Sequence, residues 1–251
     1  MDETVKYYNL LLVYSVKILI ILQVVPLILG LLKWKHFNKP IKVFWTFSFV
    51  YFLLDLFVQI LVWLLSNYYD YFKPMVLKFQ IKDFSFTNIL YYMNNFSLLG
   101  YFFVLVLKPY RISYWIKWIS VFLFFASIIN YLFIEGYNVV GVFNPTSDAL
   151  FCFVLPSIFM WYLFAQDGKV PIAKNPYFWI NLRLIVPNLV ALILHFIGNK
   201  IQSTDTVLFL KISLAKNAIW VLGLIFLTVG FYYARYTKYL PQKTVTPSPL
   251  Q

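Results

Sequence analysis

Asp55 is an acidic residue inside a long apolar stretch at residues 43–65. A central Asp or Lys in a membrane-spanning helix costs about 2.5–3.5 kcal/mol, so such residues usually mark a site or path for ligands, ions or protons. We expect Asp55 to be the only acid within the apolar stretches and Lys216, in the last stretch, to be its partner. The pair is either a structural ion pair or the centre of a ligand-, ion- or proton-coupled site.

Further polar side chains are predicted at the same depth. At a rise of about 1.5 Å per residue, Asp55 and Lys216 lie at nearly one level, and helical spacing places other polar residues on shared faces near it. These faces should turn away from lipid, where unsatisfied polar groups are costly. A cavity between the second, third, sixth and seventh helices is therefore predicted, with the ligand-binding residues Asp55, Lys216, Asn95, Asn188, Asn217 and Tyr91. The alternative is ordinary interhelical hydrogen bonding, worth about 0.6–2 kcal/mol per bond.

Long helices are needed to position these residues. The chain has 251 residues, of which 62% are hydrophobic and 12% charged, and a membrane-spanning helix takes about 20 apolar residues. The sequence predicts an all-α, polytopic membrane protein with one seven-helix transmembrane domain at residues 1–238 and a disordered cytoplasmic tail at 239–251. The helices are predicted near residues 9–32, 43–65, 86–107, 112–134, 149–166, 177–198 and 207–233.

Basic residues divide unevenly between the two sets of helix ends. Twelve of the 21 Lys and Arg residues flank one set, five flank the other and four fall within predicted helices. Cytoplasmic loops carry the excess of positive charge, so we expect the N-terminus outside and the C-terminus in the cytoplasm. This asymmetry accounts for the net charge of +12, and nucleic-acid binding is not expected.

Motifs for known catalytic chemistry are missing from the sequence. There is no HExxH, GxSxG, P-loop or GxGxxG pattern. The two histidines and the single cysteine, Cys152, give no metal-binding cluster. We therefore expect no enzymatic activity, no cofactor and no metal site. Arg183 and Lys211 lie close enough to helix ends for their long side chains to reach the headgroups, so we expect structural roles for them.

Two predicted outer loops carry strand-like patterns. Leu77, Phe79 and Ile81 alternate with polar residues, the period-two pattern of a half-buried strand. Residues 139–143 form a second short apolar run. We expect the two segments to pair as a small β lid over the outer mouth of the bundle. The alternative is an apolar loop that rests on the membrane surface.

Seven helices, an outside N-terminus and an outward-facing polar cavity suit a receptor or sensor. Such a protein would bind a small molecule from outside and pass a rearrangement to a cytoplasmic signalling protein. The alternative is a small-molecule or ion transporter or channel. Transporters commonly contain internal repeats, and no convincing repeat relates the first three segments to the last three.

Two resemblances add to this interpretation. Residues 175–180, residues 211–220 and the polar start of the third helix resemble an uncharacterised family of bacterial seven-transmembrane-helix proteins. That resemblance implies a bacterial inner membrane and no established activity. Separately, Lys216 with Asp55 as counter-ion resembles the retinal-linking lysine of microbial rhodopsins. This chain has Asn94 and Asn95 where that family has an acid, so a retinal-binding pigment is a minor alternative.

Overall fold

The computed structural model describes residues 3–79, 84–136, 141–165 and 171–234, and every regular element within them is a helix. Seven of these helical segments are long and apolar enough to cross a membrane, as the sequence predicts. The elements are α1 (Glu3–Lys33), η1 (Trp34–His36), α2 (Lys39–Asn67), α3 (Tyr69–Lys78), η2 (Phe84–Thr87), α4 (Asn88–Asn94), η3 (Asn95–Leu99), α5 (Gly100–Val106), α6 (Ile112–Ile129), η4 (Asn130–Ile134), α7 (Phe143–Phe164), η5 (Ile172–Lys174), α8 (Pro176–Thr204) and α9 (Thr206–Tyr233). The third span is α4, η3 and α5 in succession, and the fourth is α6 with η4.

Three long helices begin at side chains that satisfy their first free N–H groups. Asn38 accepts a hydrogen bond from the backbone of Ile41 at the start of α2, and Asn175 accepts one from Tyr177 at the start of α8. Asp205 caps α9 in the same way. Asn and Asp are favoured at this position because their oxygens replace the missing helical acceptor. The Asn38 amide also donates to the Tyr177 hydroxyl at 2.6 Å, so the starts of α2 and α8 are joined directly.

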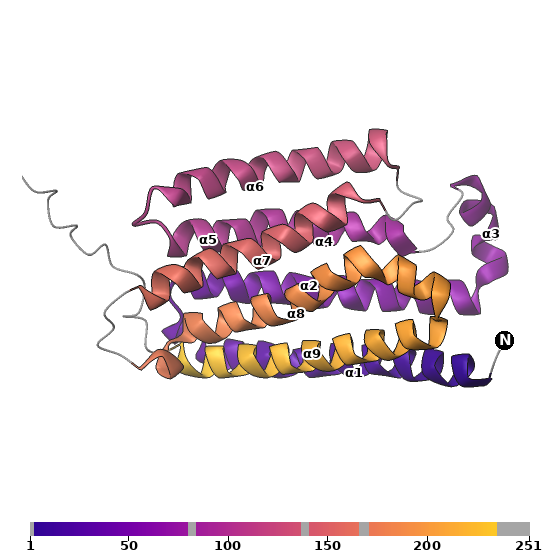
Figure 1. Cartoon of the computed structure of the whole chain (residues 1–251), viewed down its shortest axis with the longest axis horizontal. Helices are drawn as coiled ribbons and strands as arrows, with labels where there is room; N and C mark the ends of the chain where they lie inside the picture. The colour runs from indigo at the N-terminus through magenta and orange to yellow at the C-terminus, as the bar shows by residue number, and fades with distance from the viewer. Residues whose placement is uncertain (1–2, 80–83, 137–140, 166–170, 235–251) are drawn as a thin grey trace, which may run out of the picture.

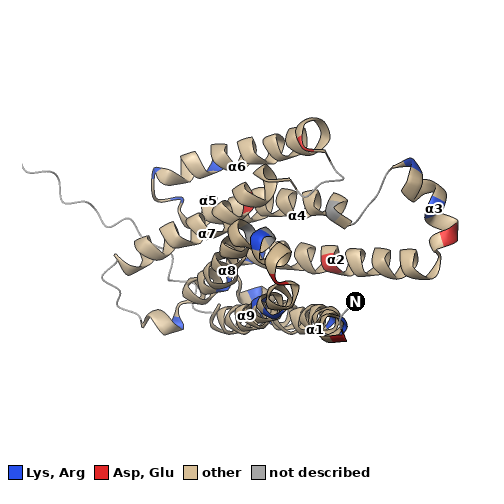
Figure 2. Cartoon of the chain, turned by 45° about the vertical axis from the view of Figure 1, so that its right-hand side comes forward, with Lys and Arg blue, Asp and Glu red and all other residues tan. Residues whose placement is uncertain are grey.

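Six of the seven spans surround a common centre. α1 packs against α2 and α9, α9 packs against α8, and α8 packs against α7. The third span packs against α2 and contacts α7, which closes the ring. α6 packs on the third span from outside the ring and forms one edge of the bundle (Figure 1). Many large apolar side chains are exposed around the molecule, and charged residues are sparse along the helices (Figure 2). Together with the seven apolar spans, this surface indicates that the protein lies in a lipid bilayer.

The apolar core is concentrated at the end of the bundle opposite the N-terminus. Its fully buried rings come from α2, α5, α7, α8 and α9, so five spans meet there without a gap large enough to expose them. Protein interiors are close-packed, so these rings fill the space between the five spans at this end of the bundle. The rings are Phe44, Phe102, Phe103, Phe159, Tyr177 and Phe231.

The start of the segment predicted as the first strand of a β lid, Leu77 and Lys78, is the end of a helix instead. α3 spans Tyr69–Lys78 and projects from the N-terminal end of the bundle (Figure 1). Tyr69, Phe72 and Val76 share one helical face at spacings of three and four residues. The alternating run that begins at Leu77 is too short to distinguish a strand from a helix end. The strand prediction is therefore wrong for residues 77–78. Residues 80–82 of this segment and residues 139–140 of the other lie outside the described residues, and Phe143 already belongs to α7.

Glu135 fastens the start of α7 to the end of the fourth span. One carboxylate oxygen accepts from the Asn130 side chain at 2.6 Å, and the other accepts from the backbone N–H groups of Val142 and Phe143 at 2.9 and 3.1 Å. Slight burial of the carboxyl group opposes ionisation, but these three hydrogen bonds outweigh it and lower the pKa of Glu135 below its ordinary value of 4.5.

This clamp should make the stability of the protein depend on pH. A lowered folded-state pKa stabilises the protein above the ordinary value, and the stabilisation is lost as pH falls through the folded pKa. We therefore expect Glu135→Gln to lower the melting temperature of the detergent-solubilised protein at neutral pH, and the difference from the natural chain to shrink below about pH 4. Thermal unfolding measured across this range checks it. An unchanged difference from pH 7 to pH 3 would contradict the role of the ionised carboxylate.

Candidate ligand-binding cavity

Asp55 is held by two neutral side chains and not by Lys216. The Gln23 amide on α1 donates to Oδ2 at 2.6 Å, and the Tyr91 hydroxyl on α4 donates to Oδ1 at 2.8 Å. Among the described residues, Asp55 forms no ion pair with Lys216, so the predicted direct pairing is wrong. Both carboxylate oxygens are already occupied by donors from neighbouring helices. Gln23, a polar residue in the first apolar stretch, was the missed signal for this network.

Lys216 and Asn217 nevertheless face the cavity that Asp55 lines. A cavity of about 300 Å³ is bordered by Asp55, Gln59, Tyr91, Lys216 and Asn217. The Asn217 amide donates to the Ser15 hydroxyl at 2.8 Å and so joins α9 to α1. Lys216 forms no hydrogen bond or ion pair within the described residues, which leaves its ammonium free to meet a ligand.

Asp148 is a second acid within the spans, which contradicts the expectation that Asp55 is alone. The sequence-based boundary placed the fifth helix at residue 149, but α7 begins at Phe143 and carries Asp148 in its second turn. Asp148 Oδ1 accepts from the Asn95 amide at 2.7 Å and from the Cys152 thiol at 3.9 Å. Asn95 opens the π-helical turn η3, and π-helical turns often lie at functional sites.

Arg183 also points inward, contrary to the prediction that it reaches a helix end. Its guanidinium carbon lies 4.4 Å from the centroid of the Trp220 ring, a cation–π contact between α8 and α9. Within the described residues it donates no hydrogen bond and forms no ion pair. Its stem passes Gly223, where an added Cβ would lie 2.9 Å from Arg183 Cδ. The lack of a side chain at Gly223 therefore gives Arg183 its route into the cavity.

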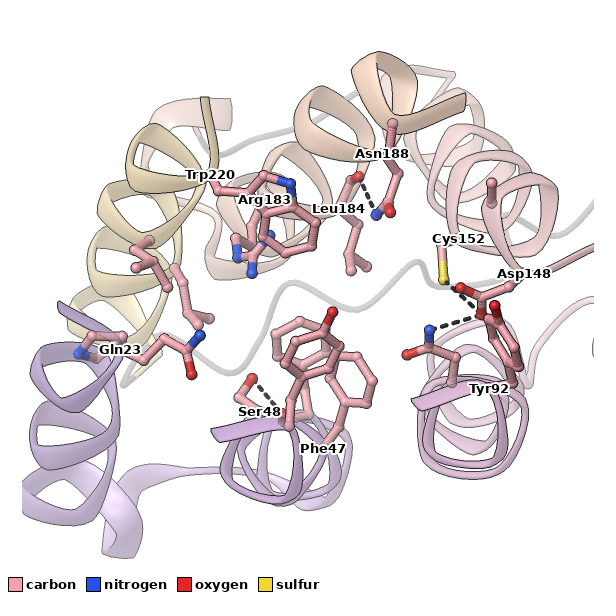
Figure 3. Close-up of a pocket in the computed structure, with 18 of the residues that line it drawn as sticks. Gln23, Phe47, Ser48, Tyr92, Asp148, Cys152, Arg183, Leu184, Asn188 and Trp220 are labelled. Carbon is pink, nitrogen blue, oxygen red and sulfur yellow. Dashed lines mark hydrogen bonds between the residues drawn. The ribbon is translucent and has the colours of Figure 1, made fainter. Parts of the chain in front are cut away.

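Arg183 faces a second cavity of about 270 Å³, which reaches from α1 and α9 across to α7. Figure 3 shows Arg183 beneath Trp220 on one side of this cavity and Asp148 with Cys152 on the other. Asn188 also borders it, with its amide donating to the Leu184 carbonyl of the same helix at 2.8 Å. All six spans of the ring contribute to the lining, so α1 and α7 join the four helices predicted from sequence.

A third cavity, of about 580 Å³, opens beside the start of the third span. Asp55, Asp148, Asn95 and Asn88 border it. Tyr51 lines all three cavities. The three spaces thus adjoin one another around Tyr51 and form one polar interior, which we call the central cavity.

All six residues predicted as ligand-binding border the central cavity. The geometry divides them: Asp55, Tyr91, Lys216 and Asn217 lie on the α1–α9 side, whereas Asn95 and Asn188 border the space that holds Arg183 and Asp148. Ligand binding by them stays a prediction. Within the described residues no group of three or more His, Cys, Asp or Glu side chains is arranged to hold a metal ion. No protein-family model, curated protein or solved structure matches this chain.

Proposed function

We propose that this protein is a membrane receptor or sensor that binds a small polar ligand in the central cavity and passes a rearrangement to a cytoplasmic protein. The observation that carries this proposal is a cavity that is wide at one end of the bundle, while buried aromatic rings pack together at the other end. Asn88 and Thr87 border its wide part at the start of the third span. At the other end, rings such as Phe102 and Tyr177 are fully buried. This arrangement favours entry of a ligand from the side of Asn88, where the cavity is wide, over passage between the rings at the other end.

The charge distribution supports outside access. The wide part lies at the end of the bundle that holds the N-terminus and few basic residues, and the positive-inside rule assigns that end to the outside. The end with the buried rings and most of the basic residues then faces the cytoplasm, where a partner protein would respond to a change in the arrangement of the helices. The resemblance to bacterial seven-helix proteins favours the inner membrane as the location.

A transporter is the second candidate, and one observation favours it. Tyr51 borders all three parts of the central cavity, so movement of a single ring could connect or separate them. Alternating access, however, also needs an opening at the basic end. Opening it would require separating rings from α2, α5, α7 and α8, which bury large apolar areas together. We therefore favour the receptor.

Cysteine labelling tests the side of access. Replacing the buried Cys152 with serine gives a cysteine-free background, into which Asn88→Cys or Leu99→Cys is introduced. We expect a membrane-impermeant thiol reagent to label Asn88→Cys in intact cells, because Asn88 borders the wide part of the cavity. Leu99→Cys is the control, since Leu99 is fully buried. Labelling of Asn88→Cys only in inverted vesicles would overturn the proposed direction of access.

A second experiment separates receptor from transporter. A photo-crosslinking residue at Ile172, exposed in η5 at the basic end, is compared with the same residue at Phe133, exposed near the opposite end. We expect a defined protein adduct at Ile172 alone, with a yield that changes in Asp55→Asn, and no solute flux in reconstituted vesicles. Flux that depends on Asp55, without such an adduct, would replace the receptor by the transporter.

A further inference from the structure

Arg183 and Asp148 are opposite charges that face one cavity without pairing. Arg183 enters from α8, and Asp148 enters from α7 on the other side (Figure 3). Neither forms an ion pair with any described residue. Charged groups within a membrane domain normally pair with one another or mark a ligand path. Two complementary charges held apart across a cavity therefore call for a molecule that meets both.

The Asp148 side offers acceptors that lack donors. Both hydrogen bonds to this carboxylate end on Oδ1, so Oδ2 receives none within the described residues. Next to it, Asn95 uses its amide nitrogen on Asp148, while its Oδ1 is buried without a hydrogen-bond partner. A buried oxygen without a hydrogen-bond donor is unfavourable. A primary ammonium has three donors and no acceptor, which matches this pair of oxygens.

The Arg183 side offers donors that lack acceptors. The Trp220 ring covers one face of the guanidinium at 4.4 Å, so its donor edge, which lies in the plane, stays available to the cavity. A planar guanidinium binds a carboxylate or phosphate through two parallel hydrogen bonds. Asp55 also shares a cavity with Arg183, but both of its carboxylate oxygens already accept from Gln23 and Tyr91. An amine alone would therefore leave the Arg183 donors without an acceptor, and an acid alone would leave Asp148 and Asn95 without a donor.

The space between the charges suits a small molecule. Its volume of about 270 Å³ lies just below the roughly 300–1,000 Å³ typical of ligand pockets. Tyr51, Tyr92 and Trp220 also border it, with Trp220 beside Arg183 and Tyr92 beside Asp148 (Figure 3). Aromatic faces cover the carbon atoms of a ligand and also attract an ammonium. A short backbone with charges at its two ends fits these walls.

We propose that the ligand of the central cavity is a small amino-acid-like zwitterion, with its ammonium at Asp148 and Asn95 and its anionic group at Arg183. This inference rests on the proposed function, since it names the ligand class of the same cavity.

Thermal shift measurements on the purified protein test this ligand class. The probes are the free amino acids, several ω-amino acids with longer spacing between the charges, and phosphoethanolamine as the phosphate counterpart. For the strongest binder, the amine that lacks the acid group and the acid that lacks the amine are measured as well. We expect at least one zwitterion to raise the melting temperature, and both half-molecules to bind about 10- to 100-fold more weakly, as expected for the loss of a hydrogen-bonded charge.

Variants of the two charged residues should lose selectivity in opposite ways. Asp148→Asn should stop favouring the zwitterion over the acid half-molecule, and Arg183→Met should stop favouring it over the amine half-molecule. Asp148→Glu and Arg183→Lys, which keep the charges, guard against loss of folding. Asp70→Asn and Lys108→Met are matched controls, because both residues are exposed and lie outside the linings of all three parts of the central cavity; these variants should bind as the natural chain does.

The outcomes separate the ligand class from the function. The zwitterion inference is wrong if no zwitterion binds, or if Asp148→Asn and Arg183→Met leave the preference for the zwitterion over its half-molecules unchanged. In that case crosslinking of a partner at Ile172 still tests whether the protein is a receptor. If a zwitterion binds with the expected selectivity and is carried across vesicle membranes, the inference stands and the receptor function is replaced by transport. Stabilisation by neutral polar compounds alone would overturn the zwitterion and keep the cavity as a ligand site.

Discussion

Removing Asp55 and Tyr91 together should destabilise the protein by less than the sum of the two single changes. The Tyr91 hydroxyl donates to the Asp55 carboxylate at 2.8 Å, and hydrogen bonds to charged groups contribute about 1.5–3 kcal/mol. We therefore expect a coupling energy of that size in a double-mutant cycle with Asp55→Asn and Tyr91→Phe. Unfolding of the detergent-solubilised protein by denaturant measures it. The cycle isolates the pair from the cost of burying the carboxylate, which each single variant changes as well.

A second cycle with Lys216 is the control. Asp55 and Lys216 border the same cavity, but the two carboxylate oxygens are occupied by Gln23 and Tyr91. Asp55→Asn and Lys216→Met should therefore add to within about 0.5 kcal/mol. A coupling with Lys216 that equals or exceeds the coupling with Tyr91 would restore the ion pair predicted from sequence and contradict the arrangement described above.

Alanine at Gly223 should disturb the packing of Arg183, which borders the cavity. An added Cβ would lie 2.9 Å from Arg183 Cδ and 3.0 Å from Pro187 Cγ. The proline ring is rigid and belongs to the neighbouring helix, so α8 and α9 must separate or Arg183 must leave its place over Trp220. Overpacking of this kind costs about 1–3 kcal/mol. We expect a lower melting temperature for Gly223→Ala, together with altered Trp220 fluorescence from loss of the cation–π contact.

Gly198 provides a matched control on the same pair of helices. Its added Cβ would meet Phe209 of α9 at 3.6 Å, which is ordinary van der Waals contact. Gly198→Ala should therefore be neutral or stabilise the protein by about 0.4–1 kcal/mol, because alanine restricts the unfolded chain. Equal destabilisation by both substitutions would show that the close approach at Gly223 has no special role in placing Arg183.

The helices could be predicted because apolar length alone identifies a membrane span. The level of Asp55 and Lys216 could also be predicted from helical rise, and both residues do border one cavity. The partner of Asp55 could not be predicted in the same way, because the helical rise gives only the depth of a residue. It does not indicate which side chains of neighbouring helices hydrogen-bond to the carboxylate. Gln23 and Tyr91 occupy Asp55, and only the packing of α1 and α4 against α2 brings them there.

Asp148 and Arg183 were misjudged for different physical reasons. Asn144 and Pro145 precede Asp148 and are typical of a loop, yet proline is tolerated in the first turn of a helix, so α7 starts earlier than hydropathy indicates. Arg183 is long enough to reach either a headgroup or the interior. Its direction depends on the space left by Gly223 on a different helix, and sequence position cannot reveal that space.

The Asp55 network has a consequence for biosynthesis. Gln23, Asp55 and Tyr91 belong to three consecutive spans that are synthesised before α7, α8 and α9, so the acid can acquire both donors before those helices are made. Lys216 and Trp220 arrive with the last span, which packs against the first and closes the ring. The buried acid can therefore be hydrogen-bonded before the bundle is complete, whereas the central cavity forms only once synthesis has reached α9.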